Sequence, residues 1–145
     1  MEKMTFEELA PGDFATVFDL LNEAELDYSD LGQPGIRLFQ MVESGRVTAV
    51  GGLEIRAGQA LLRSVAVKKE WQGTGLGKKL VAQIEKAAGQ SGIQSLYLLT
   101  TTASGFFQSL GYSPIHRDDF AEPLKKTAQF AGLCPVSAVC MKKEL

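Results

Sequence analysis

Six residues, Gln-Gly-Thr-Gly-Leu-Gly at 72–77, constrain this chain more than any other stretch. They follow a short β-branched run and precede an amphipathic pattern, so the sequence predicts a strand, a tight loop and a helix. Glycines at alternate positions allow the loop to turn and leave its N–H groups uncovered. Together with the unpaired N–H groups of the first helical turn, they form a site for a phosphate or pyrophosphate. Lys78 and Lys79 add positive charge there.

Spacing separates this loop from two other phosphate-binding loops. A P-loop requires a glycine five residues before its Gly-Lys and a Ser or Thr after it, but Gln72 and Lys79 occupy those places. A G-x-G-x-x-G dinucleotide fingerprint that starts at Gly73 or Gly75 ends on Lys78 or Leu80. The pattern that fits is Q/R-x-x-G-x-G/A at a junction between strand and helix.

In that pattern Gln72, Gly75 and Gly77 occupy the three key places, and the chain resembles the GNAT N-acetyltransferases along nearly its whole length. The resemblance implies one GNAT domain over residues 1–145. It implies an α/β fold with a mixed, mostly antiparallel sheet of six to seven strands and helices on both faces. It further implies acetyl-CoA as cosubstrate, a small-molecule amine as acceptor and no metal. The alternative is a glycine-rich turn that holds no ligand.

Composition limits the classes of partner. The 145 residues suit one domain, and a net charge of −2 gives no general attraction to nucleic acid or to an anionic membrane. No apolar run near the N-terminus is long enough for a signal peptide or a membrane span, so we expect a cytoplasmic protein. The two cysteines have neither a metal spacing nor a disulfide pattern. The oligomeric state stays open, and a homodimer is compatible with the sequence.

Periodicity predicts the remaining elements. Helices are expected from residue 11, where Phe14, Val17 and Leu21 share one face, from 76 to about 90, and over 103–110. Strands are expected at 3–7, 37–43, 46–56, 61–68, 94–100, 112–116 and 137–143, with hairpin turns at 44–45 and 57–59. The strand at 94–100 must run parallel to the one before the loop, because a helix crosses between them. A short helix or loop is expected at 123–130.

The family resemblance assigns cofactor-binding positions. It places a β-bulge at Val65, Ala66 and Val67, whose backbone amides would hold pantetheine and polarise the thioester carbonyl. The loop residues that would contact the pyrophosphate are Gln72, Gly73, Thr74, Gly75, Leu76, Gly77 and Lys78. Thr100 and Phe107 stand where family members frequently have an asparagine and a tyrosine that border the cofactor.

Phe107 is a departure from the family pattern, because phenylalanine has no proton for the leaving thiol. Residues 61–64 also contain no carboxylate, although several family members keep a glutamate base there. Glu54 on the neighbouring strand is the candidate general base, with a solvated strand carboxylate as the alternative. Tyr112 is the candidate general acid, with a core position as the alternative. The chain is then a slower enzyme, an enzyme with relocated acid–base groups, or a binding protein.

Charged residues raise two further questions. Arg63 lies inside an apolar run and needs an anion, either a substrate carboxylate or a structural acid such as Glu54, which we favour. The acidic residues Glu23, Glu25, Asp27 and Asp30 attract a cationic amine or form a solvated loop, and the solvated loop is the commoner meaning of such a run. Cys134 is either a thiol near the acceptor or plain packing, and His116 is expected at the surface.

The last third is similar to GNAT proteins described as arsenic-resistance acetyltransferases. The similar segments are Leu98–Ala103, Phe106-Phe107, Gly111-Tyr112, Gln129-Phe130 and Leu133–Pro135. The resemblance suggests acetylation of a small amine linked to detoxification of arsenic or xenobiotics. The competing interpretation is a non-catalytic acyl-CoA-binding regulatory module on the same fold.

Overall fold

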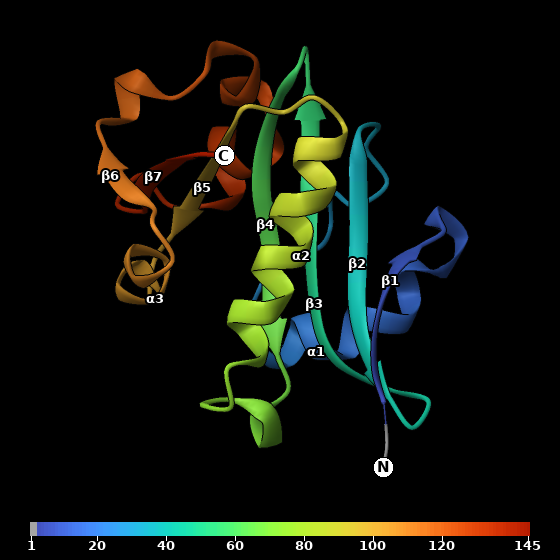
Figure 1. Cartoon of the computed structure of the whole chain (residues 1–145). Coiled ribbons are helices and arrows are strands. Elements are labelled where there is room, and N and C mark those ends of the chain that lie inside the picture. The colour runs from blue at the N-terminus through green and yellow to red at the C-terminus, as the bar shows by residue number, and fades with distance from the viewer. Residues whose placement is uncertain (1–2) are drawn as a thin grey trace.

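The computed structural model describes residues 3–145, which form a seven-stranded sheet in the order β1-β2-β3-β4-β5-β7-β6 (Figure 1). Only β4 and β5 pair in parallel, and every other neighbouring pair is antiparallel. The strands are β1 (Met4–Leu9), β2 (Ile36–Glu43), β3 (Arg46–Arg56), β4 (Gln59–Val67), β5 (Ser95–Thr100), β6 (Ser113–Ile115) and β7 (Val139–Glu144). The predicted mixed, mostly antiparallel sheet is confirmed.

The two predicted hairpins are also present. Ser44 and Gly45 have φ angles of 53° and 73° between β2 and β3, and Ala57 and Gly58 have φ angles of 49° and 79° between β3 and β4. Two consecutive residues with positive φ match the right-handed twist of the paired strands, as in a type I′ turn.

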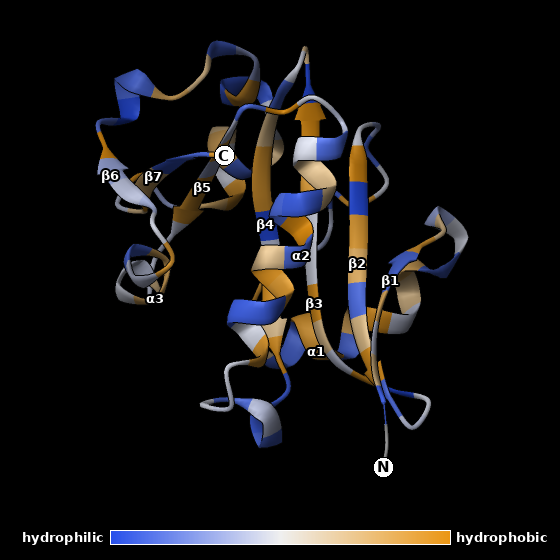
Figure 2. Cartoon of the chain, viewed as in Figure 1, coloured by the Kyte–Doolittle hydropathy of each residue, from blue (hydrophilic) through white to orange (hydrophobic). Residues whose placement is uncertain are grey.

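Helices cover both faces of the sheet, as predicted. On one face α2 (Leu76–Gln90) and α3 (Ser104–Ser109) pack on the sheet, with Leu80 and Ile84 of α2 fully buried. On the other face lie a 3₁₀ helix (Pro11–Val17) and α1 (Phe18–Glu23), which bury Val17 and Leu21. In Figure 2 the strands β3 and β4 are mostly hydrophobic, whereas α2 alternates between hydrophobic and hydrophilic residues.

The first helix differs from its prediction, because it is divided into these two short pieces. Gly12, Thr16 and Val17 have low helix propensity, which explains why one continuous α-helix does not form. The segment 123–130, predicted as a short helix or loop, falls in a 3₁₀ turn at Glu122–Lys126 and a π-helical turn at Gln129–Leu133, and another 3₁₀ turn at Arg117–Asp119 precedes it. Phe120 and Leu124 pack on Leu61 and Tyr97. Within residues 3–145 no helix is both long and apolar enough to cross a bilayer.

A β-bulge interrupts β4 beside two glycines of β3. Val50 pairs with Ala66 and Gly52 pairs with Arg63, so two residues of β4, at 64 and 65, lie opposite Gly51 alone. Ser64 has a φ of 57°, a left-handed conformation that is uncommon for serine. The bulge thus begins one residue before the position that the family resemblance implies.

Gly51 lies under α2 with no room for a side chain. A Cβ atom there would stand 2.6 Å from Cδ1 of Ile84 and 3.3 Å from Cδ2 of Leu80. We expect Gly51→Ala to lower the free energy of unfolding by about 1–3 kcal/mol, because the core would be overpacked. Ile84→Val removes Cδ1, so adding it to Gly51→Ala should recover at least half of the loss in urea unfolding.

Gly89→Ala is the matched control, because a Cβ at this helical position meets nothing within 4 Å. This variant should gain about 0.5–1 kcal/mol from reduced freedom of the unfolded chain. Strictly additive effects of Gly51→Ala and Ile84→Val would contradict the predicted close contact.

Candidate active site

The glycine-rich loop adopts the geometry of an anion site. Gly73 and Gly75 have φ angles of 78° and 85°, which other residues adopt at a cost. Gly75 directly precedes α2, and within residues 3–145 no side chain caps this helix. The N–H groups of its first turn therefore remain available at the positive end of the helix dipole. Nε2 of Gln72 donates to the carbonyl oxygen of Val67 at 3.1 Å and ties the loop to β4.

A pocket of about 600 Å³ lies beside this loop. Its lining residues are Val65, Val67, Trp71, Gln72, Gly73, Gly75, Gly77, Lys78, Thr102, Ala103, Phe106 and Phe107. Thr74, Leu76 and Lys79 instead border a separate hollow next to Met41. Of the predicted loop set at 72–78, all but Thr74 and Leu76 therefore line the pocket.

A second pocket opens where β4 and β5 separate. These strands pair only at Ala60 with Leu96 and at Leu61 with Tyr97, and beyond these pairs they diverge toward the start of α2 (Figure 1). The space has a volume of about 360 Å³ and shares Val65, Val67, Gln72 and Phe107, among others, with the loop pocket. The two pockets therefore adjoin, and we call them together the cleft. Its far end reaches Leu26, Gln129 and Cys134.

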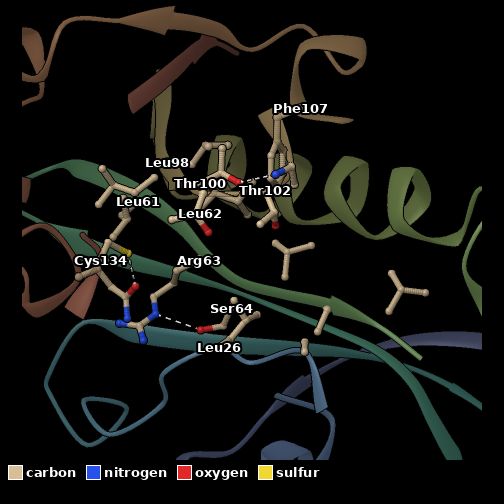
Figure 3. Close-up of a pocket in the computed structure, with 18 of the residues that line it drawn as sticks. Leu26, Leu61, Leu62, Arg63, Ser64, Leu98, Thr100, Thr102, Phe107 and Cys134 are labelled. Atoms are coloured by element: carbon tan, nitrogen blue, oxygen red, sulfur yellow. Dashed lines mark hydrogen bonds between the residues drawn. The ribbon is translucent and has the colours of Figure 1, made fainter. Parts of the chain in front are cut away.

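Side chains from both strands face each other across the cleft (Figure 3). Arg63 and Ser64 come from β4, whereas Leu98 and Thr100 come from β5 and Phe107 from α3. Oγ1 of Thr100 accepts a hydrogen bond from the N–H of Ala103 at 3.0 Å, so the hydroxyl orders the turn before α3. Of the residues predicted to bind cofactor, Val65, Ala66, Val67, Thr100 and Phe107 all border the cleft.

Glu54, the candidate base, is fully buried and lies outside the cleft lining. Its carboxylate oxygens accept from Nη1 of Arg63 at 2.9 Å and from Nη2 of Arg56 at 2.8 Å. Glu54 therefore neither lines the cleft, as the base hypothesis expects, nor contacts solvent, as the alternative expects. The hypothesis that Glu54 is the structural acid for Arg63 agrees with these contacts.

Arg63 holds a second carboxylate more closely than Glu54. Its Nη1 and Nη2 donate to the two carboxylate oxygens of Asp30, both at 2.6 Å, and its Nε donates to Oγ of Ser64 at 3.1 Å. Burial opposes the charge of the guanidinium, but hydrogen bonds and charges of Asp30 and Glu54 outweigh it and raise the pKa of Arg63. We call Asp30, Glu54, Arg56 and Arg63 the ion-pair network.

Tyr112, the candidate acid, also lies outside the cleft lining and is 2% exposed. Its hydroxyl donates to Oε2 of Glu85 at 2.9 Å, and Nζ of Lys143 lies 3.0 Å from the same oxygen. Burial raises the pKa of the phenol far above its ordinary value, and the negative charge of Glu85 raises it further. The ring packs edge-to-face on Phe107, so the contacts match the core alternative.

The acidic segment does not face the cleft as a cluster. Asp30 is occupied by Arg63, and Oδ1 of Asp27 accepts from both the N–H and the hydroxyl of Ser29. The residues of this segment that line the cleft are Ala24 and Leu26. Within residues 3–145 the cleft wall therefore contains no carboxylate that could attract a cationic amine.

Sequence reasoning missed several residues that line the cleft, including Ser64, Trp71, Thr102 and Phe106. Phe106 and Trp71 were detectable as large apolar side chains adjacent to the predicted site. Ser64 carried no signal, since its positive φ depends on the bulge. Among residues 3–145, no Asp, Glu or His lines the cleft, and no three potential metal-ligating side chains gather at one place.

Curated relatives match about half of this sequence, and solved structures match nearly the whole fold. An uncharacterized N-acetyltransferase of Chlorobaculum tepidum is 31% identical over 81 residues, which are 56% of this chain and 50% of that protein. An amino-acid acetyltransferase of Pseudomonas putida is 33% identical over 84 residues, which are 54% of this chain and 19% of that protein. The chain thus spans half or less of these curated relatives.

Among solved structures, the N-acetylglutamate synthase of Neisseria gonorrhoeae in complex with coenzyme A and N-acetylglutamate superimposes with a TM-score of 0.82. It is 19% identical, and the alignment covers 99% of this chain and 35% of that one. This likeness supports the fold. The model of the acetyltransferase (GNAT) domain matches residues 34–114, which include β2, β3, β4, the glycine-rich loop, α2 and β5. The chain therefore belongs to the GNAT acetyltransferase domain family.

Proposed function

We propose that this protein is an N-acetyltransferase that transfers the acetyl group of acetyl-CoA to the amine of a small molecule. The observation that carries this proposal is the cleft, whose adjoining pockets lie at an uncapped helix N-terminus and in the gap between β4 and β5. An anion-binding end next to a gap with a mixed polar and apolar lining suits a diphosphate attached to a long, thin acyl carrier.

The residues present fit coenzyme A. The N–H groups of the loop at 73–78 and the ammonium of Lys78 would hold the pyrophosphate, and Val65, Ala66 and Val67 would border the pantetheine. Acetyl-CoA would supply an activated acetyl thioester. The bulge at Ser64 interrupts the pairing of β4 beside the gap, and backbone amides freed there would favour charge on the thioester oxygen.

Among residues 3–145 the cleft lining contains no Asp, Glu or His that could transfer protons, and we assign Glu54 and Tyr112 structural roles. A thiol with a pKa of about 8.5 can leave as thiolate, and a missing general acid typically costs about 10²–10⁴-fold in rate. The proposed enzyme is therefore slow. We include in this proposal a cytoplasmic location and a role in detoxification of arsenic or xenobiotics, which rests on the resemblance of the last third alone.

Phe107 favours one alternative function. A phenyl ring borders the cleft where related enzymes have a tyrosine, so a non-catalytic acyl-CoA-binding module would also fit. Turnover separates the two functions. With acetyl-CoA and a panel of small amines, the enzyme should release free thiol in proportion to acetylated amine. Coenzyme binding without any release would favour the binding module.

The loop prediction uses a size-matched pair of substitutions at Gly73, whose Cβ would point into open space. Aspartate and asparagine both tolerate positive φ better than most residues, so Gly73→Asp and Gly73→Asn differ mainly in charge. We expect Gly73→Asp to weaken coenzyme A binding at least about tenfold more than Gly73→Asn does, because like charges repel at this distance. Titration calorimetry measures both, and equal losses would argue against a diphosphate at this loop.

The two lysines after the loop give a second matched pair. Lys78 lines the loop pocket, whereas Lys79 borders the separate hollow near Met41. We expect Lys78→Gln to raise the dissociation constant for coenzyme A by about three- to tenfold, the range for one exposed charge contact. Lys79→Gln should change it by less than about twofold. The reverse order would show that the cofactor lies on the other side of the loop.

Tyr112→Phe tests the structural assignment of the phenol. Removing a hydroxyl that bonds Glu85 should lower the free energy of unfolding by about 1–2 kcal/mol and leave kcat within about threefold of wild type. Thermal melting and the thiol-release assay measure the two effects. A loss of kcat of about 100-fold with unchanged stability would restore Tyr112 as the general acid.

A further inference from the structure

The far end of the cleft contains no free charge. Its wall consists of Leu26, Leu61, Gln129 and Cys134, with Leu99 and Ala24 nearby. Sγ of Cys134 donates to Oε1 of Gln129 at 3.1 Å, and burial raises the pKa of this thiol, so it stays neutral at pH 7. Apart from Arg63, the residues of this wall are therefore apolar or neutral.

Among residues 3–145, Arg63 is the one charged residue of this wall, and its charge is compensated. Its side chain is 2% exposed, and each of its three nitrogen atoms donates to Asp30, Glu54 or Ser64. Across the ion-pair network two cations match two carboxylates, so the sum of formal charges is zero. A substrate carboxylate would lose its hydration here without gaining a free cation.

The same wall provides no group to deprotonate an ammonium ion. Within residues 3–145 no Asp, Glu or His borders the cleft. The other charged groups that act on Cys134 are Arg117, Asp27 and Asp30, and none of them is part of the lining. A simple alkylamine with a pKa of about 10.4 is neutral in only about one molecule in 2,500 at pH 7. An amine next to a carbonyl group, with a pKa of about 8, is neutral in about one molecule in ten.

We infer that the acceptor is a small, apolar, weakly basic primary amine that carries no carboxylate and enters the cleft already deprotonated. This inference rests on the proposed acetyl transfer and specifies its substrate class. The neutral nitrogen forms a bond to the acetyl carbon while the carbon–sulfur bond breaks. The thiolate leaves with the electron pair, and the proton lost by nitrogen balances its charge as the free thiol forms. An α-amino amide with an aliphatic side chain has these properties.

Three compounds with the same isobutyl group test the inference: leucinamide, leucine and 3-methylbutylamine. For each we would measure kcat/KM with saturating acetyl-CoA from pH 6.5 to 9.5. Expressed per neutral amine, kcat/KM for leucine should be at least about tenfold below that for leucinamide, because only leucine brings a carboxylate into the neutral wall.

The pH profiles provide the second readout. For 3-methylbutylamine kcat/KM should rise about tenfold per pH unit from 7 to 9, since the free amine alone supplies the neutral form. For leucinamide it should level off near the pKa of the compound, about 8. A plateau for 3-methylbutylamine below pH 9 would reveal a base in the protein and overturn the inference. Preference for leucine would do the same.

Asp30→Asn provides a gain-of-function test. This near-isosteric change removes one negative charge from the ion-pair network and leaves a net positive charge at Arg63 in the cleft wall. The ratio of kcat/KM for leucine to that for leucinamide should rise at least about tenfold, which corresponds to about 1.4 kcal/mol. Asp27→Asn is the control, because Asp27 is exposed in the same segment and bonds Ser29 instead of Arg63. An unchanged ratio in folded Asp30→Asn would overturn the inference.

Two outcomes separate this inference from the proposed function. Acetylation of other amines of the panel but of none of the three compounds would overturn the assigned acceptor class alone. Absence of coenzyme A binding, or of thiol release with every amine of the panel, would overturn the proposed function and the inference together. If Asp30→Asn does not fold, as thermal melting would show, the three-compound series on the wild-type protein still decides.

Discussion

The cleft exists because β4 leaves β5 after two residue pairs. A parallel pair normally continues its ladder, and the separation exposes backbone that has to be compensated by a ligand, water or another segment. The bulge at Ser64 and Val65 adds one residue to β4 where the strands part, and it increases the local twist. Four residues separate the end of β4 at Val67 from the first residue of the glycine-rich loop, Gln72. The gap and the anion site are therefore close to each other.

The ion-pair network fixes the position of this bulge. Arg63 precedes the bulge and connects β4 to Glu54 on β3 and to Asp30 in the segment between α1 and β2. Buried ion pairs add little net stability, because the cost of desolvation offsets much of the attraction, but removal of one partner costs about 3–5 kcal/mol. The network therefore determines position more than stability. Its bond from Arg63 to Ser64 orients the residue that has the unusual φ angle.

The sequence predicted the parts of the fold that depend on local pattern. Hairpin turns at Ser44-Gly45 and Ala57-Gly58, the amphipathic face of α2 and the crossover to β5 all follow from spacing and residue type. The loop could be predicted because Gly73 and Gly75 adopt positive φ angles, which few other residues adopt without strain. The first helix was predicted as one piece, because its buried face is periodic even where Gly12 and Val17 break the backbone regularity.

The side chains at the reaction centre were less predictable, because their roles depend on partners distant in sequence. Glu54 lies on β3 and Tyr112 directly precedes β6; both are titratable, but Glu54 is held by Arg63 and Tyr112 by Glu85, and neither lines the cleft. In a strand, alternate residues point to opposite faces, and a shift by one residue exchanges cleft and core. The bulge in β4 adds one residue at position 64, so the sequence alone does not determine which residues before and after it face the cleft.

A neutral cleft wall also explains how a site with few proton carriers can work. Charges that develop during acyl transfer interact more strongly in a poorly solvated space, so a few fixed backbone dipoles have a large effect there. The same environment penalises any ion that enters without a partner. Because Asp30 and Glu54, which do not line the cleft, pair with Arg63, and Arg56 completes the neutral network, the protein places a cation beside the bulge without a net charge that would attract anions into the cleft. In the proposed reaction, selection of a neutral nucleophile would follow from the cleft electrostatics and would require no dedicated base.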